Sequence, residues 1–355
     1  MLVNHISSEG LVPIVCTDDR ADAFTTHHSD VSISAPMHQA AAEHTVVMLV
    51  DDLHLFTRTW HYSALSYPML NDRLQVSFTL RNPETTPLSL QRKLLLPFEA
   101  VKGLHGTQIH GYADSVQKEL ARLQAIPIPT LQEACETATE LMGAGDTALA
   151  SSPPEATEAL ELYRKAFYAI HILIHGRTRR VLGDGFFHNA ITKGRYAGHT
   201  GMTVRVLLRL KLVSRTIAAY NCLGEYGEAA HWGLRSIHII SESLDSGFED
   251  FLTEFLGKED VGYIYLRTAI ALWRMEGNKE QWYGELIAYA SDPGATSADL
   301  WGTARRFLGE RGEDVKRELR DNGVGESVVG LFDNVGMAAR HESVEAEDGS
   351  SSSEG

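Results

Sequence analysis

The spacing of apolar residues in the first third of the chain indicates a mixture of strands and helices. Residues 73–82 carry apolar side chains at alternate positions, which predicts a strand. We expect further short strands at 45–50 and 105–112, and helices at 88–104 and 113–126. Pro97 is expected to kink or split the first of these helices. Together these elements predict a small α+β module over residues 45–124.

From Thr130 onward the apolar positions follow a helical period, and no strand pattern interrupts them. The expected helices cover residues 130–150, 155–175, 203–222, 226–242, 260–276, 279–291 and 296–320. Most of these segments end at Gly, Pro or Asn, which commonly terminate helices. The pattern therefore predicts an all-α domain over residues 125–338.

The two ends of the chain lack such periodicity. Residues 1–44 mix Ser, Thr, Asp, His and Ala, and we expect them to be mostly disordered. Residues 339–355 are acidic and rich in serine, which predicts a disordered tail. The expected fold class is thus mainly α, with a small α+β module before the helical domain and disordered acidic termini.

Composition narrows the class of protein. The chain has 355 residues, which suits about two domains. No apolar run reaches the ~18 residues that span a membrane, and the first residues do not resemble a secretory signal. The three cysteines lie far apart, so no disulfide framework is indicated. We expect a cytoplasmic or nuclear protein with no membrane partner, in which Cys135 and Cys222 are core residues.

Charge is distributed unevenly along the chain, whose formal net charge is −15. Residues 164–215, here called the basic segment, carry eleven Lys or Arg and one acid, for a net charge of +10. Within it, Arg205 and Arg209 are four residues apart, as are Lys211 and Arg215, so each pair shares a helix face. Such a basic face is either a solvated helix surface or a site for an acidic or phosphorylated peptide. The acidic chain carries no nucleic-acid-binding motif, which argues against nucleic acid as the partner.

Three stretches of the helical half match a repeat signature, in which small residues lie where two helices cross closely. The matching residues are Gly145, Ala159, Tyr163 and Ala166; then Tyr220, Gly224, Tyr226 and Ala229; then Ala269, Ala288 and Pro293. Over about residues 128–295 the chain therefore resembles a divergent tetratricopeptide-repeat protein. The positions that the signature reserves for small residues are Gly145, Ile217 and Ala269, and Ile217 departs from the pattern because it is not small. They are 72 and 52 residues apart rather than about 34, which requires insertions at roughly 172–203 and 240–258.

The resemblance implies an antiparallel array of helical hairpins, an α-solenoid, whose concave surface binds peptides. We expect the ligand, an acidic or phosphorylated peptide, to be bound by basic and aromatic side chains, namely Arg205, Arg209, Lys211, Arg215, Arg267 and Tyr263. In the chaperone-binding branch of the family, a set of Lys, Asn and Arg residues holds a terminal carboxylate. Only Arg267 agrees with that set. The expected function is a non-enzymatic interaction scaffold or adaptor.

Motifs for cofactor and metal chemistry are missing from the sequence. Residues 142–147, MGAGDT, lack the GxGxxG spacing, and neither GxSxG nor HExxH occurs. Seven histidines lie in the first 61 residues, but their spacings match no zinc pattern. We therefore expect neither a cofactor nor a metal ion.

Three other interpretations stay open. The chain could be a substrate adaptor of a ubiquitin-ligase complex or a co-chaperone, with residues 94–112 in a docking module. It could be an enzyme with an unrecognised helical fold, for which Glu161, His171 and His175 on one expected helix are candidates. Finally, the acidic residues 341–355 could fold onto the basic segment and compete with a partner, and phosphorylation at Ser351 would add charge.

Overall fold

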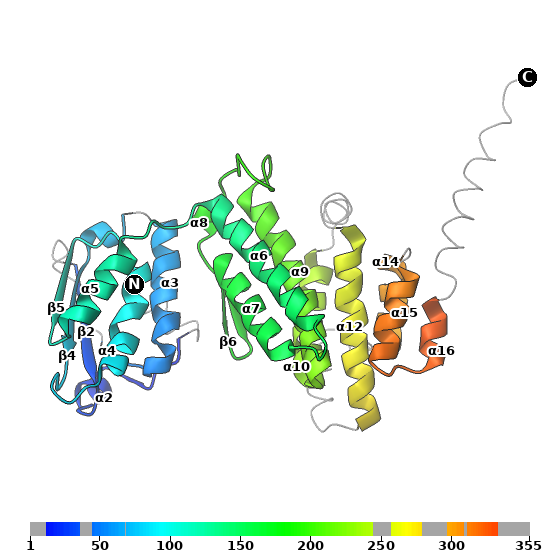
Figure 1. The fold of residues 1–355 in the computed structure, drawn as a ribbon, viewed down its shortest axis with the longest axis horizontal. Helices are drawn as coiled ribbons and strands as arrows, with labels where there is room; N and C mark the ends of the chain where they lie inside the picture. The colour runs from blue at the N-terminus through cyan, green and yellow to red at the C-terminus, as the bar shows by residue number, and fades with distance from the viewer. Residues whose placement is uncertain are drawn as a thin grey trace, which may run out of the picture. The chain divides into compact units, whose positions relative to one another are not determined.

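The structure, a computed structural model, describes residues 12–35, 45–67, 69–243, 257–278, 297–308 and 311–332. This part of the chain is mainly helical and holds three small sheets (Figure 1). The chain divides into two compact units. The first consists of Met1–Ala138 and Phe167–Arg205, and the second of Thr139–Ala166 and Val206–Gly355. Residues 167–205, which we expected inside the helical domain, thus group with the first unit.

The first unit is built around a three-stranded sheet of β2 (Ser29–Ser34), β4 (Gln75–Leu80) and β5 (Gly106–His110). Strand β4 is central, antiparallel to β2 and parallel to β5, and Phe78 lies opposite both Val31 and Ile109. The helices α3 (Leu53–Ser66), α4 (Leu88–Leu95) and α5 (Asp114–Gln124) pack against the apolar face of the sheet. Their buried core includes Trp60, Phe78, Leu95, Phe98 and Leu120.

Several expectations for this unit are confirmed. The strand at 73–82, the strand at 105–112 and the helix at 113–126 all form. The helix expected at 88–104 ends at Leu95, and a 3₁₀ turn, η3 (Leu96–Ala100), follows because Pro97 cannot continue the helical hydrogen bonding. The strand expected at 45–50 shrinks to β3 (Val46–Val47), which pairs with β1 (Cys16–Thr17).

The expectation of disorder over residues 1–44 is wrong for residues 12–35. These residues form β1, the short helix α2 (Asp19–Asp22) and β2, and Val12 is buried. Strand β2 forms because its pairing with β4 places Val31 and Ile33 against the core, which local periodicity alone does not reveal. Residues 1–11, 36–44 and the acidic 339–355 lie outside the described residues.

A β-hairpin interrupts the region that we expected to be entirely helical. Helix α7 (Ala156–Ala169) ends earlier than expected, and β6 (Ile172–His175) pairs with β7 (Thr178–Val181) around a turn at Gly176, whose φ is +52°. His171, with φ of +57°, turns the chain out of the helix. Alternating Ile and Leu residues before a Gly turn favour a strand over a helix, which explains the difference.

The second unit consists of helices. They are α6 (Leu131–Leu149), α7, α9 (Gly201–Leu223), α10 (Tyr226–Ser243), α12 (Gly257–Asn278), α14 (Ser297–Phe307), α15 (Gly312–Asp321) and α16 (Glu326–Val329), with α6, α7 and α9 beginning or ending in the first unit. The helices expected at 130–150, 203–222, 226–242 and 260–276 are confirmed. The single helix expected at 296–320 is wrong, because α14 ends at Phe307 and α15 begins at Gly312. Residues 279–296 lie outside the described part.

Close approaches between helices in the second unit depend on glycine. A Cβ on Gly145 of α6 would come within 2.4 Å of the Tyr163 ring on α7, and one on Gly233 of α10 would meet Thr268 of α12. Gly224, with φ of +75°, makes the turn between α9 and α10. The small residues Ala159, Ala166, Ala229 and Ala269 are fully buried. Tyr220 and Tyr226 are half-buried, and Ala288 and Pro293 lie outside the described residues.

Candidate functional site

Helix α9 carries four of the basic residues that the sequence singled out, and the structure places them in different surroundings. Arg205 is buried, with 3% of its surface exposed, and belongs to the first unit. Its guanidinium donates to the Asp184 carboxylate at 2.6 Å and to the Leu182 carbonyl at 3.0 Å, and lies 4.3 Å from the centre of the Phe187 ring. Arg205 is therefore held inside the protein and is not available to a peptide.

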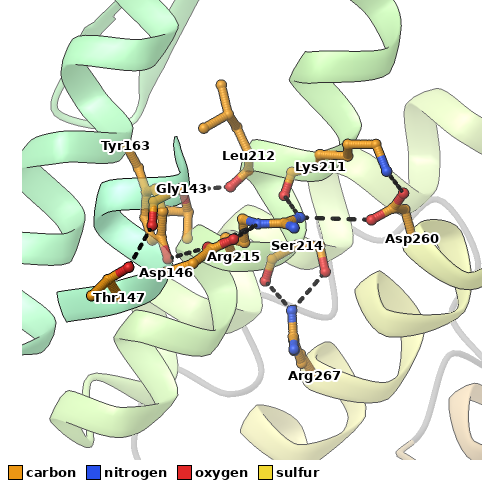
Figure 2. A network of polar contacts seen from close by, with 11 residues as sticks. Gly143, Asp146, Thr147, Tyr163, Lys211, Leu212, Ser214, Arg215, Asp260 and Arg267 are labelled. Carbon is orange, nitrogen blue, oxygen red and sulfur yellow. Dashed lines mark hydrogen bonds and ion pairs between the residues drawn. The ribbon is translucent and has the colours of Figure 1, made fainter. Parts of the chain in front are cut away.

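Arg215 forms the centre of a polar network in the second unit (Figure 2). Its Nε lies 2.9 and 2.8 Å from the two carboxylate oxygens of Asp146 on α6, and its Nη1 donates to the Lys211 carbonyl at 3.2 Å. The Tyr163 hydroxyl donates to Asp146 Oδ1 at 2.8 Å. Burial, together with the negative charge of Asp146, raises the pKa of Tyr163, so the phenol remains a donor at neutral pH.

Lys211 extends the network to the next helix. It lies one turn before Arg215 on α9, and its ammonium pairs with Asp260 of α12 at 2.5 Å. The same carboxylate lies 3.7 Å from Arg215 Nη1. Asp260 therefore faces two cations from one helix, as i and i+4 side chains share a face.

Arg267 of α12 completes the set and links α9 to α15. Its Nη1 donates to the carbonyl and the hydroxyl of Ser214, at 3.1 and 2.8 Å, while Nε and Nη2 bind the Glu318 carboxylate at 2.6 and 3.1 Å. The guanidinium also lies 4.7 Å from the ring centre of Tyr263. A two-point carboxylate contact with stacking on an aromatic ring is geometry that Arg, but not Lys, provides.

We call the six charged residues of this network the polar row: Asp146, Lys211, Arg215, Asp260, Arg267 and Glu318. Its three cations and three acids balance, so the row is neutral. Its side chains are partly exposed, from 13% for Asp260 and 17% for Arg267 to 32% for Lys211 and 40% for Asp146. An ion pair as exposed as Arg215–Asp146, at 26% and 40%, contributes about 0–1 kcal/mol to stability. The row therefore joins α6, α9, α12 and α15, but its most exposed pair is weak.

The acids of the polar row could not be found from local sequence. Asp146, Asp260 and Glu318 lie 69, 49 and 51 residues from the cations that they bind. The sequence had presented the basic segment as a surface of one charge, whereas Lys211 and Arg215 lie beside acids from other helices. Arg209 is half-buried and has an interaction partner of its own. Of the six expected binding residues, the structure brings together Lys211, Arg215, Arg267 and Tyr263.

The residues considered for an enzyme lie on different elements, with Glu161 in the second unit and both histidines in the first. Glu161 is paired with Arg164 on the surface of α7. His171 is buried and lies between the end of α7 and the start of β6, and His175 lies on β6. The expectation that they share one helix is therefore wrong. His171 instead stacks on Tyr62 of α3, with ring centres 4.1 Å apart, and its Nδ1 is buried with no hydrogen-bond partner among the described residues. Within the described ranges, no three His, Cys, Asp or Glu side chains are placed to bind a metal ion together.

The His171 ring lies in a cluster of aromatic side chains in the first unit. Besides Tyr62, it contacts Phe186 and Phe187, each with ring centres 5.0 Å away, and His61 at 6.3 Å. Burial, the neighbouring His61 and the positive charge of Arg205 lower the pKa of His171 to about 3. Burial and the charge of Arg58 lower the pKa of His61 to about 4. Both rings are therefore neutral at physiological pH and pack as apolar groups.

No helix among the described residues is both long enough and apolar enough to cross a membrane. Comparisons of the chain with protein-family models, with curated proteins and with solved structures give no match.

Proposed function

We propose that the chain is a non-enzymatic interaction scaffold of tetratricopeptide-like helical hairpins that binds an acidic peptide along the polar row. The observation that carries this proposal is the row itself. The charged side chains from α6, α9 and α12 are partly exposed to solvent, whereas side chains of a hydrophobic core would be fully buried. A peptide lying across these helices would meet Lys211, Arg215 and Tyr263 in succession.

The packing of the helices supports the hairpin part of the proposal. Gly145 against Tyr163 is a small residue at the crossing of α6 and α7, and Ala159 and Ala166 of α7 are fully buried. Gly224 provides the turn of the α9–α10 hairpin, after which Ala229 is buried. In a hairpin array the first helix of each unit lines one surface, and α6, α9 and α12 are these first helices.

The donors that remain on the polar row favour an acidic ligand. Lys211 directs one contact to Asp260, and an ammonium has three donors. Arg215 Nη2 makes no hydrogen bond within the part of the chain that the structure describes. Charged donors that are partly exposed and incompletely used suit a carboxylate better than an apolar or basic group.

Fluorescence anisotropy with labelled hexaglutamate and hexalysine peptides tests the proposal. We expect the full-length chain to bind hexaglutamate, with an affinity that falls as salt is added, and not to bind hexalysine. Lys211→Met should weaken binding by about fivefold, equivalent to ~1 kcal/mol. Lys165→Met is the matched control, because Lys165 is exposed on α7, a helix that contributes no charged residue to the row.

Two results would contradict the proposal. One is the absence of hexaglutamate binding at low salt by a protein that melts cooperatively. The other is an equal effect of Lys211→Met and Lys165→Met, which would assign any binding to the charge of the chain as a whole rather than to the polar row.

A further inference from the structure

Asp146 is the most exposed acid of the polar row, and this separates it from the other two. Its side chain is 40% exposed, against 21% for Glu318 and 13% for Asp260. Glu318 binds Arg267 through both carboxylate oxygens, and Asp260 faces both Lys211 and Arg215. Within the row, Asp146 alone combines high exposure with a single cationic partner among the described residues. It is therefore the acid that another carboxylate can replace most readily.

The pairing between Asp146 and Arg215 uses the guanidinium incompletely. Both carboxylate oxygens lie near Nε, at 2.9 and 2.8 Å. A guanidinium normally binds a carboxylate with two parallel N–H donors. In the residues that the structure describes, Nη2 of Arg215 has no hydrogen-bond acceptor. The contact therefore leaves a donor unused and is weaker than a side-on pair with Nε and Nη2 would be.

We infer that Asp146 is an intramolecular competitor, whose carboxylate occupies Arg215 in place of a carboxylate from the bound peptide and thereby limits affinity for acidic ligands. This inference rests on the proposed function. A peptide carboxylate that takes the place of Asp146 at Arg215 inherits the Nε donor and gains Nη2 as a second, parallel donor. Asp146, already partly exposed, returns to water.

The competition also gives selectivity. A peptide with a single acidic residue offers one carboxylate and gains little binding free energy by displacing Asp146. A run of acidic residues places several carboxylates near Arg215 and Lys211, which raises the effective concentration of the competing group. Asp146 therefore restricts the polar row to densely acidic peptides, and its removal relaxes that requirement.

Binding of labelled hexaglutamate to Asp146→Asn tests this inference. The amide has nearly the size of the carboxylate but carries no charge, so Arg215 becomes available. We expect binding about fivefold tighter than wild type at low salt, equivalent to ~1 kcal/mol. The matched control is Glu161→Gln, which removes the same charge from the second unit but lies outside the polar row, where it pairs with Arg164. It should change affinity by less than about twofold.

Each outcome separates the inference from the proposed function. If wild type binds and Asp146→Asn binds no tighter, the competitor role is wrong and the binding function stands. Equal tightening by both variants would show a general effect of net charge and would also overturn the inference. Binding by Asp146→Asn alone would support the competitor role and would contradict peptide binding by the wild-type chain. Binding by neither would overturn both proposals. Should Asp146→Asn not melt cooperatively, Asp146→Ser provides a second neutral variant with the same expectation.

Discussion

Gly145 of α6 lies directly against the ring of Tyr163 on α7, so close that a Cβ would reach within 2.4 Å of a ring carbon. The ring is fully buried, and its hydroxyl reaches the carboxylate of Asp146, the residue after Gly145. The absence of a side chain at one position therefore sets both the separation of two helices and the orientation of an acid in the polar row. Packing and the proposed site are connected at this contact.

Gly145→Ala should destabilise the protein by about 1–3 kcal/mol, because the methyl group would overlap the Tyr163 ring. Alanine has a higher helix propensity than glycine, by about 1 kcal/mol, so the substitution destabilises the protein only if the steric overlap costs more than this gain. Gly143, two residues earlier, is the control, because a methyl group there would have no neighbouring atom within 4 Å. Gly143→Ala should be neutral or stabilising. Chemical denaturation of both variants measures the difference, and equal effects would refute the close contact.

Arg205→Met should reduce stability by about 2–4 kcal/mol and leave hexaglutamate affinity unchanged. The reason is that Arg205 is buried and binds the Leu182 carbonyl and Asp184 rather than solvent. Arg164→Met, which removes an exposed arginine paired with Glu161, should cost less than about 0.5 kcal/mol. Melting curves and anisotropy on the same preparations provide both readouts. A loss of peptide affinity at unchanged stability would place Arg205 in the binding site instead.

Acidification should destabilise the protein through His171 and His61. Their pKa values are about 3 and about 4 in the folded chain, below the ordinary value of 6.5, so the unfolded chain binds protons first as the pH falls. The contribution of the two neutral rings is complete above pH 6.5 and decreases progressively from there toward pH 3. We expect a loss of roughly 4 kcal/mol between about pH 7 and about pH 5, with about 2 kcal/mol from each ring.

His171→Asn should make this pH dependence shallower by about half, since asparagine tolerates the positive φ at this position and does not titrate. His188→Asn, at an exposed position, is the control. Urea unfolding at several pH values between about 5 and about 8 measures the slopes. A slope that is the same in wild type and His171→Asn would contradict the assignment to this ring.

The three cysteines should react with thiol reagents at different rates. Cys222 is exposed near the end of α9, which corrects the expectation that it is a core residue. Cys135 is buried on α6, and burial raises its pKa to about 12. Thiolate is the reactive form, so Cys222 should react rapidly in native buffer and Cys135 only after denaturation. Mass spectrometry of labelled peptides identifies the sites. Early modification of Cys135 would contradict its burial.

Much of the helical half could be predicted from the sequence because its signals are local. The apolar period locates α6, α9, α10 and α12 within a few residues, and Gly224 marks the turn between two of them. The hairpin β6–β7 was missed, although the alternation of Ile and Leu before Gly176 indicates a strand. Helix α3 was missed as well, although Phe56 and Trp60 lie on one face.

The character of the candidate site could not be predicted in the same way. The sequence directed attention to Lys211, Arg215 and Arg267, but it offered no sign of the acids that bind them. Ion pairs between residues about 50 to 70 positions apart depend on how helices pack, and no local pattern encodes that. Strand β2 shows the same limit, because only its pairing with β4 explains why it is ordered.

Hydrogen–deuterium exchange of the full-length chain with and without hexaglutamate tests the central claim most directly. We expect slower exchange with the peptide in residues 139–149 and 206–223, which carry Asp146, Lys211 and Arg215, and smaller changes in α12. Protection confined to the first unit, for example to the hairpin β6–β7, would contradict binding along the polar row. So would the absence of any protection at a peptide concentration that saturates binding.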